Sequence, residues 1–266
     1  MDASVSEPIL ITDRDDERIS AYRDIRERDL VGRQGLFVAE GEVVLRVLLR
    51  ARRHRPLSVL IAQKRWPALS TMLAGCEAPI YLASQTVLDA IAGFEMHRGI
   101  LAIGRAGEAA PPADLLAGLG PDAMVVCLFG IGNHDNMGGI FRNAAAFGVD
   151  AVLLDDACCD PLYRKAIRVS VGGCLKVPFA RFEGDNALST LKGAGFDVLA
   201  LSPNGKEPLA GYRRARRVAV LLGAEGPGLS DAILAQARTV RIPMAGGFDS
   251  LNVATTSGIV LAHLSA

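Results

Sequence analysis

Three loops of the chain combine polar side chains with glycines in a way that could support chemistry. In the first, GIGNHDNMGGIFRNAAAFG (130–148), Asn136 and Arg142 stand among small and apolar residues. In the second, LLGAEGPGLSD (221–231), glycines flank Glu225 directly after an apolar run. The third, IPMAGGFDSLNVATTSGIVL (242–261), holds Ser250-Leu251-Asn252. An arginine on a largely apolar helix needs an anionic partner or a wet cleft, unless its long side chain simply reaches solvent.

Alternating strands and helices are predicted to position these loops. MVVCLFG, DAVLLDD, VPFAR, FDVLALS, RVAVLLG and TVRIPM have the apolar character of strands, and helical patterns lie between them. The alternation predicts a mostly parallel sheet covered on both faces. Ligands of such sheets bind at the carboxyl ends of the strands, where all three loops begin. Asn136, Ser230 and the Ser250–Asn252 pair are the expected helix N-caps.

The first half of the chain has the pattern of a smaller α/β unit. GLFVA, LSVLIA, PIYLA and RGILAIGR are predicted strands, one helix is expected to begin near Gly41, and another is expected after Ser84 as N-cap. The segment after it is dense in Gly, Ala and Pro, which is typical of a linker. The sequence therefore predicts a domain at 1–105, a linker at 106–122 and a second domain at 123–266.

Composition narrows the class of protein. Of 266 residues 50% are hydrophobic, and 29 basic residues balance 29 acidic ones, so the net charge neither favours nor excludes RNA. The acidic N-terminus has no apolar signal core, and no apolar run approaches the roughly 20 residues that span a membrane. Five cysteines without CxxC spacing and four scattered histidines indicate no metal site. We expect a cytoplasmic protein without a membrane segment.

A dinucleotide-binding interpretation of the first loop is an alternative. GIGNHDNMGG is rich in glycine, and Asp155 follows the next strand, where a ribose-binding acid would stand. The pattern G-x-G-x-x-G fails, however, because position 135 is Asp. A Rossmann-type class I methyltransferase or dinucleotide enzyme would also leave the second and third loops without a role.

Taken together and in this order, the three loops resemble the motifs of the SpoU/TrmH-type RNA 2′-O-methyltransferases of the SPOUT superfamily. DNMGGIFRNAAAFGVD resembles the first motif, LLGAEGPGLS the second and IPMAGGFDSLNVATTSGIVL the third. CDPLYRKAIRVSVGG is similar to the family's basic Arg-x-Ser-x-Gly segment, and parts of the first half look like its small RNA-substrate-binding domain. One departure is Ala254-Thr255-Thr256, where the family usually has Ser-Val-Ala.

The resemblance implies a trefoil knot in the C-terminal domain, S-adenosylmethionine as cofactor, and a homodimer with active sites at the subunit interface. It assigns catalysis to Arg142, supported by Asn136, Glu225, Ser250 and Asn252. It places the cofactor against a second set: Leu201, Gly223, Glu225, Ile242, Met244 and Leu251. Because arginine has a pKa above about 12, we expect Arg142 to act through charge and positioning rather than as a base.

The expected partner is RNA, ribosomal more than transfer RNA by family analogy. Phosphate contacts are predicted for two groups: Arg164, Lys165, Arg168 and Ser170 beside the active loops, and Arg46, Arg50 and Arg53 in the first domain. For the second group a solvated helix face is the plainer interpretation. A catalytically inactive RNA-binding protein is a further alternative, which the intact Asn136, Arg142, Glu225 and Asn252 disfavour.

Overall fold

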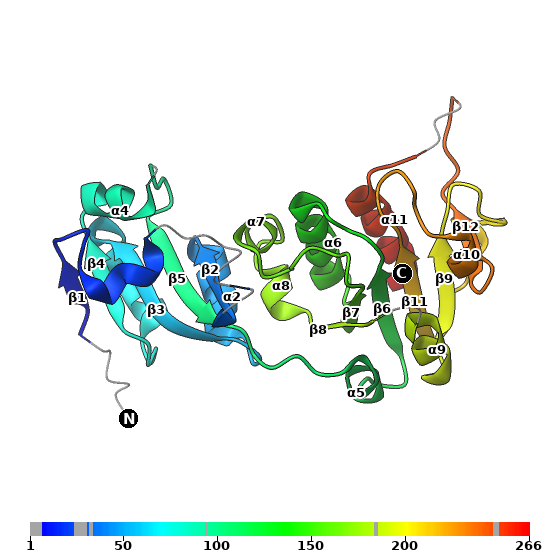
Figure 1. Cartoon of the computed structure of the whole chain (residues 1–266), viewed down its shortest axis with the longest axis horizontal. Coiled ribbons are helices and arrows are strands. Elements are labelled where there is room, and N and C mark those ends of the chain that lie inside the picture. The colour runs from blue at the N-terminus through cyan, green and yellow to red at the C-terminus, as the bar shows by residue number, and fades with distance from the viewer. Residues whose placement is uncertain (1–6, 24–30, 32–33, 94, 184–185, 247–249) are drawn as a thin grey trace. The chain divides into compact units, whose positions relative to one another are not determined.

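A computed structural model describes the chain except for residues 1–6, 24–30, 32–33, 94, 184–185 and 247–249 (Figure 1). The first range belongs to the acidic N-terminus and the last to the loop before Ser250, so the predictions for those residues lie outside the described part. The chain divides into two compact units, 1–108 with 162–175 and 109–161 with 176–266. Each is considered by itself.

The N-terminal unit is built on a five-stranded mixed sheet in the order β1-β4-β3-β5-β2. Strands β1 (Ile9–Ile11), β4 (Ile80–Ala83) and β3 (Arg55–Ala62) are parallel, whereas β5 (Ile100–Arg105) runs antiparallel to both β3 and β2 (Leu36–Glu40). This confirms four predicted strands. The sequence pattern did not predict β1, which is only three residues long.

Helices and short 3-10 turns complete this unit. They are η1 (Glu17–Tyr22), α2 (Glu42–Arg50), η2 (Gln63–Arg65), α3 (Trp66–Leu73), α4 (Gln85–Ala92) and, from the later segment, α7 (Arg164–Val169). Helix α2 begins directly after Gly41, which has φ +90°. Helix α4 begins as predicted, because the Ser84 hydroxyl accepts a hydrogen bond from the Val87 N–H. A core that includes Ile19, Leu60 and Leu101 fills the space beneath them.

The C-terminal unit contains a seven-stranded sheet in the order β10-β12-β9-β11-β6-β7-β8. Its strands are β6 (Ala123–Leu128), β7 (Ala151–Leu154), β8 (Phe179–Arg181), β9 (Asp197–Leu201), β10 (Glu207–Pro208), β11 (Arg217–Leu222) and β12 (Arg238–Arg241). Every pairing is parallel, which confirms the predicted mostly parallel sheet. Strand β6 is buried along its whole length, as its continuous apolar sequence requires.

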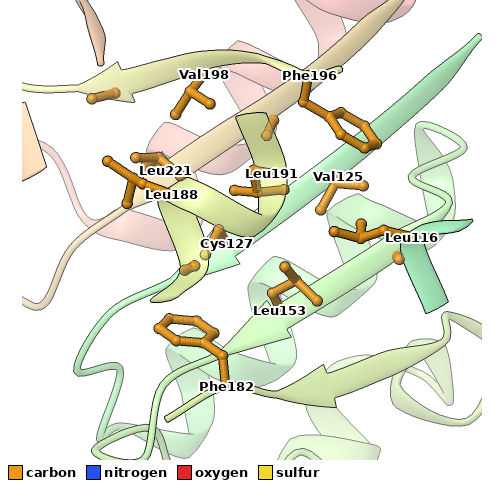
Figure 2. Packing of buried hydrophobic residues seen from close by; sticks show 14 of the residues in the cluster. Leu116, Val125, Cys127, Leu153, Phe182, Leu188, Leu191, Phe196, Val198 and Leu221 are labelled. Atoms are coloured by element: carbon orange, nitrogen blue, oxygen red, sulfur yellow. The ribbon is translucent and has the colours of Figure 1, made fainter. Parts of the chain in front are cut away.

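Helices complete the C-terminal unit. Helices α5 (Pro112–Ala117) and α9 (Asn186–Gly193) pack together, and Figure 2 shows Leu188 and Leu191 of α9 beside Cys127 and Leu221 of the central strands. Helices α6 (His134–Ala146) and α11 (Val253–Ser265) pack against each other. Short elements η3 (Leu209–Gly211) and α10 (Asp231–Leu234) connect the rest, and the segment 162–175 of the other unit ends within α8 (Gly173–Lys176). In the described part of the chain no helix combines the length and apolarity needed to cross a bilayer.

Two local predictions differ from the structure. The segment 106–122, expected to be a linker, contains α5, whose Leu116 is fully buried in the core of the sheet unit. Helix α6 begins at His134 with Asn133, not Asn136, as its N-cap. The Asn133 side chain accepts hydrogen bonds from the N–H groups of Asp135 and Asn136, so the helix starts three residues earlier than expected.

Candidate functional site

A pocket of about 730 Å³ opens at the carboxyl ends of β9, β11 and β12. This is the size of a site for a small molecule, and its position is where parallel sheets bind ligands. All six residues predicted to contact a cofactor line it: Leu201, Gly223, Glu225, Ile242, Met244 and Leu251. Ser250 and Asn252 line it as well. The structure therefore gathers the second and third loops around one cavity.

Glycines shape the loop that carries Glu225. A Cβ on Gly223 would lie 2.3 Å from the carbonyl carbon of Gly228, so only glycine lets the loop fold back on itself there. Gly226 and Gly228 have φ values of +86° and +67°, which disfavour any side chain. Ala224 and Gly228 close the loop with an isolated bridge. The result is a tight turn with Glu225 exposed at its tip.

Three side chains from three different loops form a hydrogen-bonded cluster at the pocket. The Asn136 amide donates to Glu225 Oε1 at 2.8 Å, and the Asn252 amide donates to Asn136 Oδ1 at 2.8 Å and to Glu225 Oε1 at 3.1 Å. Asn136 is 6% exposed, so its polar side chain needs these partners. We call Asn136, Glu225 and Asn252 the amide–carboxylate cluster.

Asn252 also begins the last helix. Its Oδ1 accepts hydrogen bonds from the N–H groups of Ala254 and Thr255, which makes it the N-cap of α11. The same side chain therefore caps the helix through its oxygen and joins the amide–carboxylate cluster through its nitrogen. Ser250, the other predicted cap, does not serve as the N-cap of α11.

Arg142 lies apart from the pocket. It is exposed on α6, does not line the cavity, and pairs with no residue in the described part of the chain. Its neighbour Asn143 instead faces α11, donating to the Ala254 carbonyl at 2.8 Å and to the Ser257 hydroxyl at 2.9 Å. Helix α6 thus directs Asn136 into the cluster, Asn143 to α11 and Arg142 to solvent.

Close packing of α6 and α11 gives a reason for the small residue at position 254. A Cβ on Gly139 would lie 2.7 Å from the Ala254 Cβ, which is closer than two carbon atoms pack. Asn143 crowds Gly258 in the same way, with its Nδ2 3.2 Å from a Cβ built there. Small side chains at these positions keep the two helices near enough for Asn136 to reach Asn252.

Asp155 has a structural partner for each carboxylate oxygen. Its Oδ2 accepts from the Gly130 N–H and its Oδ1 from the Cys158 N–H, both at 2.9 Å. The Cys158 sulfur accepts from the Ile131 N–H, and the Cys159 N–H donates to the Ile131 carbonyl. These bonds join the loops after β6 and β7. They argue against Asp155 as the ribose-binding acid of a dinucleotide site, since both oxygens are used within the protein.

The residues predicted to bind RNA differ in their contacts and in their exposure. Arg164 pairs with Glu40 at 3.1 Å, and Arg46 pairs with Glu42 at 2.9 Å. Ser170 is 3% exposed, and its hydroxyl donates to the Ile167 carbonyl. Arg53 is half-buried and donates to the Glu108 carbonyl. Exposed on the surface are Lys165, Arg168 and Arg50.

Some pocket residues were not predicted from the sequence. Ser202, Asn204, Asp231 and Thr256 also line the cavity. Thr256 stands four residues after Asn252 on α11 and so shares its helix face, a signal that could have been used. Ser202 and Asn204 follow β9, whose place between β11 and β12 is a property of the fold. Within the described ranges no three His, Cys, Asp or Glu side chains could together hold a metal ion.

Comparison with known proteins identifies the family of this chain. The model of the SpoU rRNA methylase family matches residues 123–262. A relative, an uncharacterised tRNA/rRNA methyltransferase of Mycobacterium bovis, is 42% identical over 94% of this chain and 88% of its own length. A crystal structure of an RNA 2′-O ribose methyltransferase superposes with a TM-score of 0.79 at 25% identity, covering 96% of this chain and 97% of the other.

A second solved structure, an rRNA methyltransferase from Sinorhizobium meliloti with AdoMet bound, shares the fold. Its TM-score is 0.80 at 22% identity, with 96% of each chain covered. The family match and the 42% identity to the mycobacterial relative are decisive. The chain belongs to the SpoU rRNA methylase family and is an RNA methyltransferase that uses S-adenosylmethionine.

Proposed function

We propose that this protein transfers the methyl group of S-adenosylmethionine to a ribose 2′-hydroxyl of RNA, and that the RNA is ribosomal. The amide–carboxylate cluster beside the pocket is the observation that carries the proposal, because it joins all three loops at one point. Two groups of similar proteins support the proposal. A structural neighbour at 25% identity is an RNA 2′-O ribose methyltransferase, and the mycobacterial relatives are named as tRNA/rRNA methyltransferases.

The pocket residues fit this cofactor. Leu201, Ile242, Met244 and Leu251 offer apolar walls to the adenine ring, and the turn at Gly223–Gly228 brings backbone groups to the cavity. A volume of about 730 Å³ suits a nucleoside with an amino-acid tail. When bound, the cofactor supplies an electrophilic methyl group. The protein has to hold the ribose hydroxyl near attack distance and stabilise the negative charge that develops on it.

We assign that stabilisation to Arg142. A guanidinium keeps its proton at neutral pH, so it acts as a fixed positive charge beside the forming alkoxide. Glu225, Asn136 and Asn252 orient the groups around it, and Ser250 completes the same edge of the pocket. The cluster is pre-formed, since each amide already has its acceptor.

A homodimer explains why Arg142 lies outside the pocket of its own chain. We propose that it enters the pocket of a second subunit, where its charge would meet Glu225. Support comes from α11, whose exposed residues Thr255, Ile259 and Ala262 carry no charge. Ile259 is 39% exposed and lies on the helix that packs against α6.

Three broader assignments accompany the proposal. The C-terminal unit is proposed to be knotted, as the family resemblance implies. The last helix, α11, packs against α6. The N-terminal unit is proposed to bind the RNA substrate, with Lys165, Arg168 and Arg50 as exposed phosphate contacts. We also propose that the protein acts in the cytoplasm, on the RNA found there.

Arg142→Ala tests the catalytic assignment. We expect methyl transfer to be lost while calorimetry still detects S-adenosylmethionine binding, because the apolar walls and the glycine turn assigned to the cofactor are unchanged. Arg213→Ala, at an exposed arginine outside the three loops, is the matched control and should keep full activity. Near-normal turnover of Arg142→Ala would overturn the assignment, and failure of the wild-type protein to bind the cofactor would favour an inactive RNA-binding protein.

The position of the methyl group is tested on the product. A 2′-O-methyl group blocks alkaline cleavage of the adjacent phosphodiester, because the hydroxyl that attacks it is gone. Mapping of alkali-resistant sites in ribosomal and transfer RNA, with and without the protein, therefore tests both the ribose and the RNA class. A methylated base, or methylation of transfer RNA alone, would contradict the proposal.

A mixing experiment tests the shared site. Arg142→Ala and Glu225→Ala should each be inactive alone. A heterodimer of the two has one site in which an intact Arg142 meets an intact Glu225, provided that the arginine crosses the interface. Partial activity after mixing supports the homodimer, whereas no recovery in a demonstrated heterodimer would contradict it.

A further inference from the structure

Four exposed arginines gather at one end of the N-terminal sheet. Helix α2 ends at Arg50, the following turn contains Arg52, β3 begins at Arg55, and β5 ends at Arg105. All four are exposed. We propose that this surface, the arginine end (Arg50, Arg52, Arg55 and Arg105), holds phosphates of the RNA substrate. The inference rests on the RNA substrate proposed above.

Arg55 and Arg105 face each other directly. In the antiparallel pairing of β3 with β5, Arg55 is the register partner of Arg105. Side chains of directly opposite residues point to the same face with Cβ atoms roughly 5 Å apart, and like charges in that position destabilise a sheet. An opposite charge at either position would stabilise the strand pair. The sequence instead places two positive charges together, which fits a surface that meets an anion.

Several other arginines of this unit pair with carboxylates within the protein. Arg46, one turn before Arg50 on α2, pairs with Glu42, and Arg18 pairs with Asp16. Arg65 shares Glu42. Among the described residues, none forms an ion pair or hydrogen bond with the side chains of Arg50, Arg52, Arg55 or Arg105. The contrast separates the arginine end from a helix face with ordinary surface ion pairs.

The chemistry of this surface selects an RNA backbone. Guanidinium groups match phosphate oxygens with paired N–H donors, and they keep their charge at any physiological pH. A protein interface of useful affinity needs apolar or aromatic anchors, and the exposed large apolar side chains in the described part of this unit are Leu10 and Val43 alone. Because the described residues there include no exposed aromatic ring that could stack on a base, the arginine end holds phosphates and reads no sequence.

The salt dependence of RNA binding gives a quantitative test. Each phosphate contact contributes roughly 0.7 for single strands to 0.9 for duplexes to the slope of log K against log salt. The double variant Arg55→Gln/Arg105→Gln should therefore lower that slope by roughly 1.4 to 1.8 in magnitude if both residues bind phosphates. The probes are a fluorescent RNA hairpin and a single strand of equal length, titrated at several salt concentrations.

The control removes the same charge from paired arginines. Arg14→Gln/Arg18→Gln takes two positive charges from the same unit, where Asp15 and Asp16 lie beside them. It should leave the salt slope nearly unchanged. A thermal melt checks that the double variant is folded. Because the substitutions relieve the repulsion between Arg55 and Arg105, this variant should be at least as stable as the wild type.

The outcomes separate this inference from the proposed function. An unchanged slope in Arg55→Gln/Arg105→Gln, or an equal loss in the control, overturns the arginine end while methyl transfer at saturating RNA stands. If Arg55→Gln/Arg105→Gln lost binding to phosphatidylserine vesicles while its RNA binding stayed intact, the surface would be assigned to membranes, and the inference would also be overturned. Absence of methyl transfer to any RNA by the wild type would instead refute the proposed function.

Discussion

Replacement of Asn252 separates the two tasks of that side chain. Its Oδ1 caps α11 through the N–H groups of Ala254 and Thr255, and its Nδ2 donates to Asn136 and Glu225. Asn252→Ala removes both sets. Loss of the cap costs about 1 kcal/mol, and loss of the amide donors costs about another 1 kcal/mol in this exposed position. We expect the free energy of unfolding to fall by about 2 kcal/mol.

Two conservative variants divide that sum. Asn252→Ser keeps a hydroxyl that can cap the helix, so only the amide contribution of about 1 kcal/mol is lost. Asn252→Asp also keeps the cap, but it sets a carboxylate beside Glu225 Oε1, where the wild-type nitrogen lies at 3.1 Å. At that distance two charges in a water-like medium repel by roughly 1.4 kcal/mol. This deficit should disappear as the pH falls below about 4, where Asp and Glu take up protons.

Urea unfolding at pH 7 and pH 4 measures the stability, and calorimetry with a methyl-transfer assay measures the site. All three variants should lose transfer activity, since each lacks the amide that joins Asn136 to Glu225. An Asn252→Ser protein with full activity would refute a role of the amide in the site. An Asn252→Asp protein whose deficit is the same at both pH values would refute its proximity to Glu225.

Two further predictions concern packing and pH. Gly139→Ala should lower the free energy of unfolding by about 1 kcal/mol. Overpacking against Ala254 costs about 2 kcal/mol, and the better helix propensity of alanine returns about 1 kcal/mol. Urea titration should show that adding Ala254→Gly partly restores the stability. Burial, with a smaller contribution from Arg53, lowers the pKa of His54 to about 4. The unfolded chain, with a His pKa near 6.5, therefore binds the proton more readily, so stability should be full above about pH 6.5 and fall by up to about 3 kcal/mol as the pH drops to 4. His54→Gln should remove most of this slope in melts across that range, and an unchanged slope would show that other groups cause it.

Local sequence chemistry predicted elements that depend on local interactions. Ser84, Ser230 and Asn252 cap helices as expected, because a cap needs only a side-chain oxygen near the next two or three N–H groups. The same reasoning could not choose between Asn133 and Asn136, which have identical side chains. The choice depends on Asn136 being taken by Glu225, 89 residues away in the chain.

Sequence patterns did not predict the elements that are held in place by contacts between residues far apart in the chain. Helix α5 lies in a segment rich in Pro, Ala and Gly, and its Leu116 is buried only because β7, β8 and α9 lie around it. The order of strands in the sheet, and hence the place of Ser202 and Asn204 in the pocket, follows from pairings far apart in sequence. The motif resemblance indicated which residues belong to one site, and the fold shows how the amide–carboxylate cluster brings Asn136, Glu225 and Asn252 together.

The geometry of Glu225 suggests how the proposed site is completed. Both amide donors of the cluster bond to the same carboxylate oxygen, Oε1, so the amides hold the carboxylate in place without using Oε2. Glu225 is exposed, and Oε2 is therefore available to a donor that arrives from outside the chain. A guanidinium or a ribose hydroxyl is such a donor. Arg142, exposed and outside the pocket of its own chain, carries the complementary charge. In the proposed homodimer, the arginine of one subunit would therefore meet the carboxylate that the amides of the other subunit hold through a single oxygen.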